Sequence, residues 1–447
     1  MNKVMISEVI DKLGISKFTF KIYFLIGLVL LFDGFDYMIV AYTMPQISGE
    51  WGLTLVQTGS LASWSLLGLM IGGLFAGIIS DRIGRKNILI FSCLAYSILT
   101  FSIYFALNYE TFAILRILVG FGLGACIPVS VTLVSEFAPT KNRGFFTSSI
   151  MAFYIMGWVV AGIVATYVVP VFGWRICYLV GALPALYVLI LAFFLNESPH
   201  WLLSKGREKE AINVISIMEK TVKGEASDWK EGNLVAPPPP KSFGIKAIFS
   251  SEYRLATINL CVMYFMGSLV IYGITGWLPS LLVEKGYGLI KSYSFAILQN
   301  LFSIVGSLVT GYIADIIGRR KNVIWGWTFT AIAVVLLGYA TNQWQVVFCG
   351  VLVGITMNYG LSGMQPLLAE AYRTEFRNTG VACTQAFGRI GGFCGPVAAG
   401  FVQQMGLDFT GTLIFFAVPS LICSIVALLF VRETIGERIE SVVNVKV

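Results

Sequence analysis

Two aspartates, Asp33 and Asp36, lie three residues apart inside the first long apolar run of the chain. A carboxylate near the centre of a bilayer costs about 2.5–3.5 kcal/mol on insertion scales, so such acids usually face a partner or a water-filled path and often relay protons. At about 1.5 Å per helical residue, Arg116 in the fourth apolar run reaches the same depth as the two acids. These three residues are therefore candidates for a proton-coupling centre.

The coupling would work by making and breaking an ion pair. A carboxylate beside an arginine stays ionised, whereas a carboxyl group released into an apolar cleft takes up a proton. Asp36 is the first candidate for this role and Asp33 the second, and the alternative is a permanent ion cluster that only holds helices together. The single histidine, His200, lies in a polar stretch and is expected to be a solvated loop residue, so carboxylates remain as the proton carriers.

A second cation, Arg389, lies about 15 Å along the eleventh apolar run, near the midplane where transporters bind substrate. That run contains no acidic residue, and the planar fork of a guanidinium suits a carboxylate; the alternative is an arginine bound to carbonyl groups exposed by the surrounding glycines. Aromatic and amide side chains at similar depth could complete a pocket for a ring, or could simply pack between helices. They are Tyr154, Trp158, Tyr272, Asn300, Gln365 and Gln385.

Composition indicates an all-α polytopic membrane protein. Hydrophobic residues make up 57% of the 447 residues and charged residues 12%, and apolar runs of about 20 residues recur along the chain. We predict twelve transmembrane helices, near 21–45, 57–79, 87–106, 111–135, 146–170, 176–195, 256–281, 292–316, 322–341, 344–370, 379–404 and 410–432.

The spans fall into two groups of six around a polar stretch. We expect an N-terminal half at 1–195, a cytoplasmic linker at 196–255 that contains the run Pro237 to Pro240, and a C-terminal half with a short cytoplasmic tail at 256–447. With both termini in the cytoplasm, the inner segments hold 26 of the 31 basic residues, as the positive-inside rule requires of a cell-membrane protein. This distribution explains the net charge of +7 without a nucleic-acid partner.

An internal repeat relates the two halves. The segment Gly77 to Lys86, GIISDRIGRK, ends the second span, and the similar segment Gly311 to Arg320, GYIADIIGRR, ends the eighth, 234 positions later. Glu136 and Arg143 recur at the same offset as Glu370 and Arg377. Two homologous six-helix halves are typical of secondary transporters, which bind substrate at the midplane and rock one half against the other.

The chain resembles the major facilitator superfamily along nearly its whole length. Both GxxxD…GR segments look like the signature loops of that superfamily. The Asp33-Gly34-Phe35-Asp36 element and the segment Arg116 to Gly124 are most similar to the aromatic acid:proton symporters. The resemblance implies a gating role, through ion pairs at the inner helix ends, for Asp81, Arg85, Glu136, Arg143, Asp315, Arg319, Glu370 and Arg377. Because Ile316 stands where the first loop has Arg82, we expect the two loops to differ.

We expect a proton-coupled symporter that imports small aromatic or related organic carboxylates, with the lipid bilayer as its surroundings and a monomer as its working unit. The alternatives are a facilitator carrier of another metabolite, such as nicotinate or a sugar, and a non-transporting membrane receptor. An enzyme is not expected, because the sequence shows neither a catalytic Ser-His pattern nor a cofactor motif. The eight cysteines lack metal-ligand spacing, so we expect no metal site.

Overall fold

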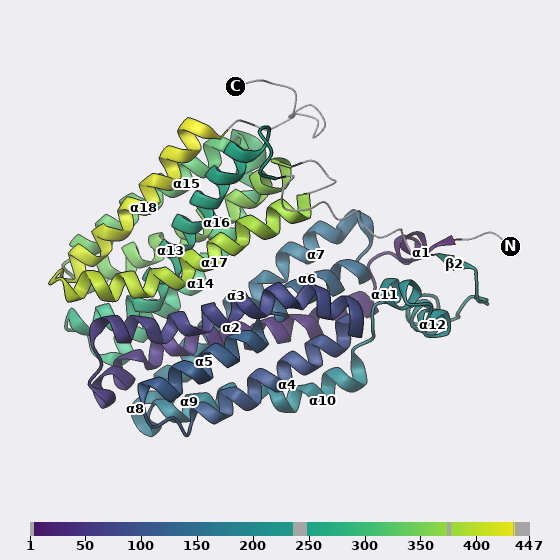
Figure 1. Ribbon diagram of the computed structural model, residues 1–447, viewed down its shortest axis with the longest axis horizontal. Coiled ribbons are helices and arrows are strands. Elements are labelled where there is room, and N and C mark those ends of the chain that lie inside the picture. Colours follow the sequence, from purple (N-terminus) through teal and green to yellow (C-terminus); the bar gives the residue numbers. More distant parts are fainter. Residues whose placement is uncertain (1–3, 236–247, 373–376, 432, 434–447) are drawn as a thin grey trace. The chain divides into compact units, whose positions relative to one another are not determined.

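Each predicted span corresponds to one helix or to consecutive helices in the computed structural model, which describes residues 4–235, 248–372, 377–431 and 433 (Figure 1). The run Pro237 to Pro240 and nearly all of the C-terminal tail lie outside the described residues. In the first half the spans are α2 (Lys17–Trp51), α3 (Leu55–Ile83), α4 (Arg85–Ile103), α5 with α6 (Tyr109–Leu123, Cys126–Phe137), α7 with α8 (Arg143–Ser149, Met151–Phe172) and α9 with α10 (Trp174–Gly181, Pro184–Phe194).

In the second half the spans are α13 (Arg254–Glu284), α14 (Leu289–Ile317), α15 (Arg319–Tyr339), α16 (Gln343–Glu370), α17 (Arg377–Gln404) and α18 (Phe409–Phe430). Within the described residues, eleven segments are long and apolar enough to cross a membrane. The predicted span that falls short is α17, because six glycines, two arginines and four amide side chains dilute its apolar residues. The predicted all-α membrane fold is nevertheless the fold that the structure has.

Contacts group the helices into two units. Unit 1 comprises Met1–Tyr37, Gly68–Gly157 and Arg175–Pro239, and unit 2 comprises Met38–Leu67, Trp158–Trp174 and Pro240–Val447. In unit 1, α4 packs on α5, α6 and α10; in unit 2, α13 packs on α17 and α18, and α14 packs on α16. The boundary between the units crosses α2, α3 and α8 and falls after the first residue of α9, so the units differ from the predicted halves, which stay a prediction.

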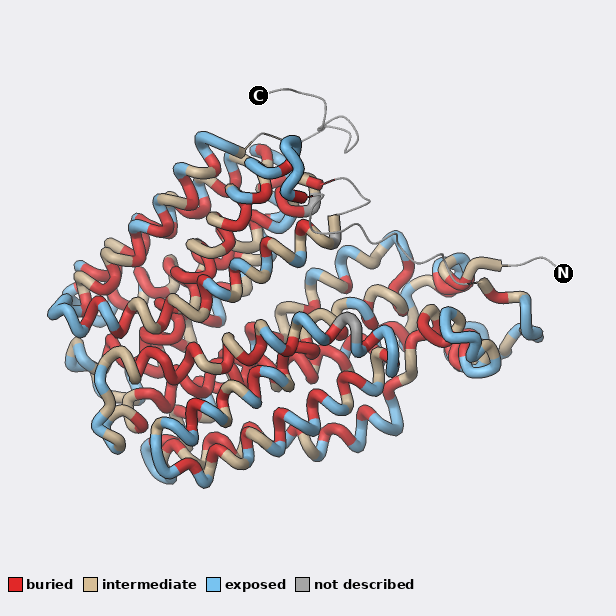
Figure 2. The backbone as a smooth tube through the Cα atoms, viewed as in Figure 1, coloured by how far each residue is buried: buried red, intermediate tan, exposed pale blue. Residues whose placement is uncertain are grey.

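Burial follows the faces of the helices. Figure 2 shows buried and exposed residues alternating along many of the long helices, whereas the central parts of α2 and α13 are mostly buried. Large apolar side chains are exposed on the outer faces, including Phe91 of α4 at 60% and Phe193 of α10 at 82%. Water would not favour such surfaces, whereas lipid chains solvate them, so the exposed faces are consistent with a bilayer around the spans.

Equivalent glycines make equivalent close helix contacts in the two repeats. A Cβ added to Gly157 in α8 would lie 2.1 Å from the Leu31 carbonyl oxygen in α2, and a Cβ added to Gly391 in α17 would lie 2.0 Å from the Phe265 carbonyl oxygen in α13. Both residues of the second contact lie 234 positions after those of the first. Small residues allow this close approach of helices in membranes. The duplication is therefore visible in the packing as well as in the sequence.

The segment after the sixth span contains more structure than a linker requires. Residues 199–235 form α11 (Pro199–Ser204), α12 (Glu208–Lys223) and β2 (Leu234–Val235), and β2 pairs in parallel with β1 (Val4–Met5). The following helix α1 (Ile6–Leu13) contacts α12, and the Asp11 side chain accepts a hydrogen bond from the Thr140 backbone N–H at 2.6 Å. Figure 1 shows these elements gathered beyond one end of the unit 1 helices. Sequence periodicity alone did not predict this small subdomain.

Candidate functional site

The centre of unit 1 holds a buried ion pair. The Arg116 Nη1 atom lies 2.9 Å from Asp36 Oδ2, and neither side chain is exposed. Thr100 donates to Asp36 Oδ1 at 2.7 Å, and Arg116 Nη2 donates to the Asp36 backbone carbonyl at 3.2 Å. Each carboxylate oxygen of Asp36 thus has its own donor, which is the arrangement that stabilises a charge inside an apolar environment.

Close helix packing positions this pair. Gly34, between the two aspartates, lies so near α8 that an added Cβ would be 2.0 Å from the Tyr154 carbonyl oxygen. Opposite it, a Cβ on Gly157 would approach the Phe35 backbone nitrogen to 2.7 Å. Because α2 and α8 meet backbone to backbone here, the acidic side chains on α2 are held at a fixed height toward α4 and α5.

One face of α4 supplies residues that our sequence analysis did not identify. Thr100 contacts Asp36 directly, and Tyr96, one turn earlier, has Asp33, Asp36, Cys93 and Cys126 as electrostatic neighbours. Asp33, Tyr96, Cys93 and Cys126 are all fully buried. The available signal was the recurrence of polar side chains at positions 93, 96 and 100, which is the spacing of a single helix face.

The predicted substrate residues of unit 2 lie partly together. Arg389 is half-buried on α17, and three residues later an added Cβ on Gly392 would be 2.7 Å from the Tyr272 ring, so Tyr272 packs one turn from Arg389. Asn300 is 2% exposed and donates to the Tyr42 hydroxyl at 3.4 Å. The other predicted substrate residues differ in burial. Gln365 and Gln385 are exposed, whereas Tyr154 and Trp158 are buried one turn apart on α8.

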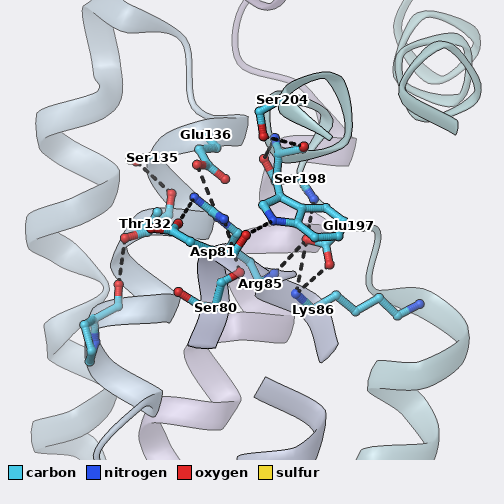
Figure 3. A network of polar contacts seen from close by, with 12 residues as sticks. Ser80, Asp81, Arg85, Lys86, Thr132, Ser135, Glu136, Glu197, Ser198 and Ser204 are labelled. Atoms are coloured by element: carbon cyan, nitrogen blue, oxygen red, sulfur yellow. Dashed lines mark hydrogen bonds and ion pairs between the residues drawn. The ribbon is translucent and has the colours of Figure 1, made fainter. Parts of the chain in front are cut away.

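The first signature loop forms a network of ion pairs (Figure 3). Arg85 Nη2 lies 2.9 Å from Asp81 Oδ1, and Arg85 Nε lies 3.6 Å from Glu136 Oε1. Trp201 in α11 donates its indole N–H to the Asp81 carbonyl at 3.0 Å. We call Asp81, Arg85, Glu136 and Glu197 the first latch, since they join α3, α4, α6 and the segment after α10.

The second signature loop repeats these contacts within unit 2. Arg319 forms an ion pair with Asp315 and another with Glu370, where Nε and Oε1 are 3.4 Å apart. Arg82 and its counterpart Ile316 both lie at exposed positions. Our expectation of different loops was therefore wrong for the contacts of the described residues, because the substituted position lies outside the ion pairs. Asp315, Arg319, Glu370 and Glu433 form the second latch.

A glutamate in each latch was missed from the sequence. Glu197 accepts hydrogen bonds from the backbone N–H groups of Arg85 and Lys86, at 3.0 and 3.2 Å, at the start of α4. Glu433 accepts from Arg319 and Arg320 at the start of α15. A carboxylate at a helix N-terminus satisfies donors that lack partners in the helix and favours the helix dipole. Burial raises the pKa of Glu197, although these hydrogen bonds oppose the rise.

His200 differs from its expected place in a solvated loop. It is half-buried in the short helix α11, and burial, together with the nearby charges of Arg143 and Arg85, lowers its pKa to about 4. Two further predicted gating residues can be placed. Arg143 lies near the first latch, since its charge acts on His200, and Arg377 is half-buried at the start of α17. Within the described residues no group of His, Cys, Asp and Glu suits a metal ion.

Comparisons with known proteins place the chain among membrane transporters. The family model described as "Sugar (and other) transporter" matches residues 17–445. The chain is 30% identical to the niacin transporter NiaP of Acinetobacter baylyi, covering 97% of this chain and 98% of that one, and 30% identical to a gallate transporter of Pseudomonas putida, covering 93% and 92%. The 4-hydroxybenzoate transporter PcaK of Acinetobacter baylyi is 29% identical, with 96% and 94% covered.

Solved structures support the same fold. The xylose transporter XylE from E. coli, in a partially occluded inward-open conformation, aligns with a TM-score of 0.75 and 18% identity over 95% of this chain and all of that chain. Its identity is low, so this likeness concerns the fold. The chain belongs to the sugar (and other) transporter family of the major facilitator superfamily, and is therefore a multi-pass membrane transporter rather than an enzyme.

Proposed function

We propose that this transporter is a proton-coupled symporter that imports small aromatic carboxylates by alternating access. The substrate class is supported by the relatives named for gallate, 4-hydroxybenzoate, benzoate and niacin, since each of these compounds joins an aromatic ring to a carboxyl group. An orientation with both termini in the cytoplasm of a cell-membrane protein accompanies the proposal, because the positive-inside rule favours it.

The observation that carries proton coupling is the fully buried Asp36–Arg116 pair. Its charges lie inside spans, where a permanent ion pair is an expensive way to join helices and apolar packing would serve as well. Transport gives the pair a reason to exist, because separating Arg116 from Asp36 would let the carboxyl group bind a proton and reforming the pair would expel it. Asp33, one turn before Asp36, would share this work.

The substrate's carboxylate would bind Arg389. The guanidinium fork can hold both oxygens of a planar anion, and the Tyr272 ring lies one turn away on the neighbouring helix α13. Esters and amides of the same ring should bind poorly, since they lack the charge that this fork recognises. Asn300 and Trp158, which belong to the same unit as Arg389, would then set the size and orientation of the ring, and Tyr154 stays a predicted substrate residue.

Gating would depend on the two latches. The ion pairs lie at helix ends, between α3 and α4 in unit 1 and between α14 and α15 in unit 2, and breaking them would release the cytoplasmic side. Within unit 2, the outer parts of α2 and α3 contact the second half: Tyr293 donates to the Tyr42 carbonyl, and Ser63 donates to the Phe393 carbonyl at 2.7 Å. These contacts would have to separate when the site opens to the outside.

A niacin transporter is the second candidate within this class, because NiaP reaches 30% identity over nearly the full chain. The test is uptake into proteoliposomes that carry an inward proton gradient, with 4-hydroxybenzoate, gallate, benzoate, nicotinate and xylose as substrates. Accumulation of one aromatic acid, abolished by a protonophore, is expected. Uphill uptake that is insensitive to the protonophore would contradict proton coupling. Uptake of xylose alone would contradict the proposed substrate class. Saturable binding without any uptake would indicate a receptor.

A further inference from the structure

The Tyr96 hydroxyl is buried without a hydrogen bond. Tyr96 is fully buried in α4, and its hydroxyl has no hydrogen-bond partner in the described part of the chain. A buried hydroxyl without a partner is costly, which favours a second arrangement of the protein in which the Tyr96 hydroxyl forms a hydrogen bond. Its electrostatic neighbours are the carboxylates of Asp33 and Asp36 on α2 and the thiols of Cys93 on α4 and Cys126 on α6. Arg116 of α5 pairs with Asp36, and Tyr187 of α10 is an electrostatic neighbour of Cys93.

The two carboxylates offer the phenol different opportunities. Both oxygens of Asp36 already have a strong donor, Thr100 on one and Arg116 on the other. Thr100, which contacts Asp36, lies one turn after Tyr96 on α4, and Asp33 lies one turn before Asp36 on α2. Because α2 and α4 are the first and third spans and run in the same direction, the phenol lies at the level of Asp33, which is also its electrostatic neighbour. The carboxylate that the phenol is placed to serve is therefore Asp33.

The equivalent positions in the second half hold no titratable carboxyl group or thiol. The counterparts of Asp33, Cys93 and Cys126, 234 positions later, are Gly267, Trp327 and Gly360. There the Trp327 indole fills the gap, since a Cβ on Gly267 would lie 2.6 Å from the ring and one on Gly360 would lie 2.9 Å from it. The first half instead keeps two small thiols, a carboxyl group and a phenol in the corresponding place.

We infer that Tyr96 is a positioning residue for proton coupling, whose hydroxyl donates a hydrogen bond to Asp33 when that carboxyl group is ionised. The bond forms after Asp33 loses its proton and breaks when the proton returns, so Tyr96 sets the pH at which Asp33 exchanges its proton while Thr100 and Arg116 hold Asp36. This inference rests on the proposed proton-coupled transport and assigns its pH dependence to one side chain.

The test compares Tyr96→Phe with Tyr264→Phe in the full-length transporter. Tyr264 is a matched control, because it is 3% exposed and its hydroxyl also lacks a hydrogen bond within the described residues, but it lies on α13 in the second half. Uptake of the aromatic acid accumulated by the native protein is measured in proteoliposomes as a function of internal pH, together with counterflow exchange at equal pH.

Tyr96→Phe should move the midpoint of the pH profile upward by about one pH unit, the scale of one hydrogen bond to a charged group. Exchange should remain within about twofold of the native rate, since a hydrogen bond of this size affects release of the proton rather than the substrate path. Tyr264→Phe should leave the midpoint unchanged. In an Asp33→Asn background, Tyr96→Phe should cause no further shift. In these variants the proton release on adding the acid is followed with a pH-sensitive dye.

Failure of the proposed function and failure of this inference give different results. If the native protein does not accumulate any acid under a proton gradient, the transport proposal fails. If the native protein accumulates the acid and Tyr96→Phe keeps the native midpoint, or if Tyr264→Phe shifts it equally, the role of Tyr96 is wrong. A shift that persists in the Asp33→Asn background would show that Tyr96 acts through another group.

Discussion

The two halves of the chain share the ion pairs of their latches, but they differ at the positions of the buried Asp36–Arg116 pair. Each half has an arginine at the start of a helix paired with two acids, and a third acid that caps the same helix. In contrast, the counterparts of Asp36, Arg116 and Thr100, 234 positions later, are Val270, Gly350 and Val334. The ion pairs and caps at the helix starts thus occur in both halves, whereas within the described residues the buried Asp36–Arg116 pair has no counterpart at the equivalent positions of the second half.

This difference separates two kinds of constraint. Helix packing is a property of each half, so equivalent glycines such as Gly72 and Gly306 meet equivalent carbonyl groups, at 2.1 and 2.0 Å from a hypothetical Cβ. The proposed coupling to a proton gradient requires only one titratable centre, and a second would add the cost of burying more charge. The second half can therefore fill the corresponding volume with apolar side chains such as the Trp327 indole.

The largest effect should come from breaking the ion pair. Arg116→Gln leaves Asp36 buried without its cation, which costs about 3–5 kcal/mol, so we expect a marked fall in Tm and complete loss of accumulation. Asp36→Asn keeps the shape but removes the charge, and should also abolish accumulation while retaining part of the substrate binding. Thermal unfolding of purified protein and proteoliposome uptake measure these outcomes.

The double variant Asp36→Asn/Arg116→Gln removes both charges of the ion pair, so that these two positions are uncharged like Val270 and Gly350 in the second half, while Asp33 is kept. Its Tm should return close to that of the native protein, because neither partner is left as an unpaired buried charge. Accumulation should remain absent. A double variant that still concentrates substrate uphill, with unchanged sensitivity to a protonophore, would place the coupling site elsewhere and remove the functional distinction between the halves.

The glycine contacts should respond equally in both halves. Gly157→Ala and Gly391→Ala each drive a Cβ into a backbone carbonyl that cannot move aside like a side chain, so each should lower stability by about 1–3 kcal/mol. Gly350→Ala is the control, because nothing lies within 4 Å of its added Cβ. Tm values measured under one condition would test the comparison, and a loss confined to one half would mean that the packing is not truly repeated.

A smaller effect should distinguish the first latch at low pH. The pKa of His200 is lowered to about 4 from 6.5, so the unfolded chain binds a proton at higher pH than the folded chain does. Stability is therefore complete above about pH 6.5 and is lost as the pH falls toward 4, by about 2 kcal/mol at pH 5. His200→Gln should remove this part of the acid sensitivity when Tm is followed from pH 7 to 5. An identical pH dependence in the variant would show that His200 is solvated.

Sequence reasoning predicted the membrane fold well, because apolar run length and the 234-residue repeat are local or linear signals. It also identified Asp36 and Arg116, since a charge inside an apolar run is conspicuous. It missed Thr100, Tyr96 and Glu197 because hydroxyl groups are common in spans and an acid in a loop is unremarkable; only the fold brings each beside its partner. The β1–β2 pairing was beyond such reasoning, since two residues on each side carry no periodicity.

The smallest effect on stability should come from the exposed acids of the latches, where the halves are most alike. The Asp81 and Asp315 side chains are 69% and 66% exposed, and pairs of this kind contribute about 0–1 kcal/mol. Asp81→Asn and Asp315→Asn should therefore leave Tm nearly unchanged, but each should favour the inward-open population and slow transport, because even a fraction of a kcal/mol matters between nearly balanced states. Labelling of cysteines introduced on either side of the membrane would measure the populations. Since both aspartates make the same contact with a helix-starting arginine, the two shifts should agree within about twofold. A shift for Asp81→Asn alone would mean that equivalent contacts in the two halves carry unequal parts of the gating, and no shift for either would move the gate away from both latches.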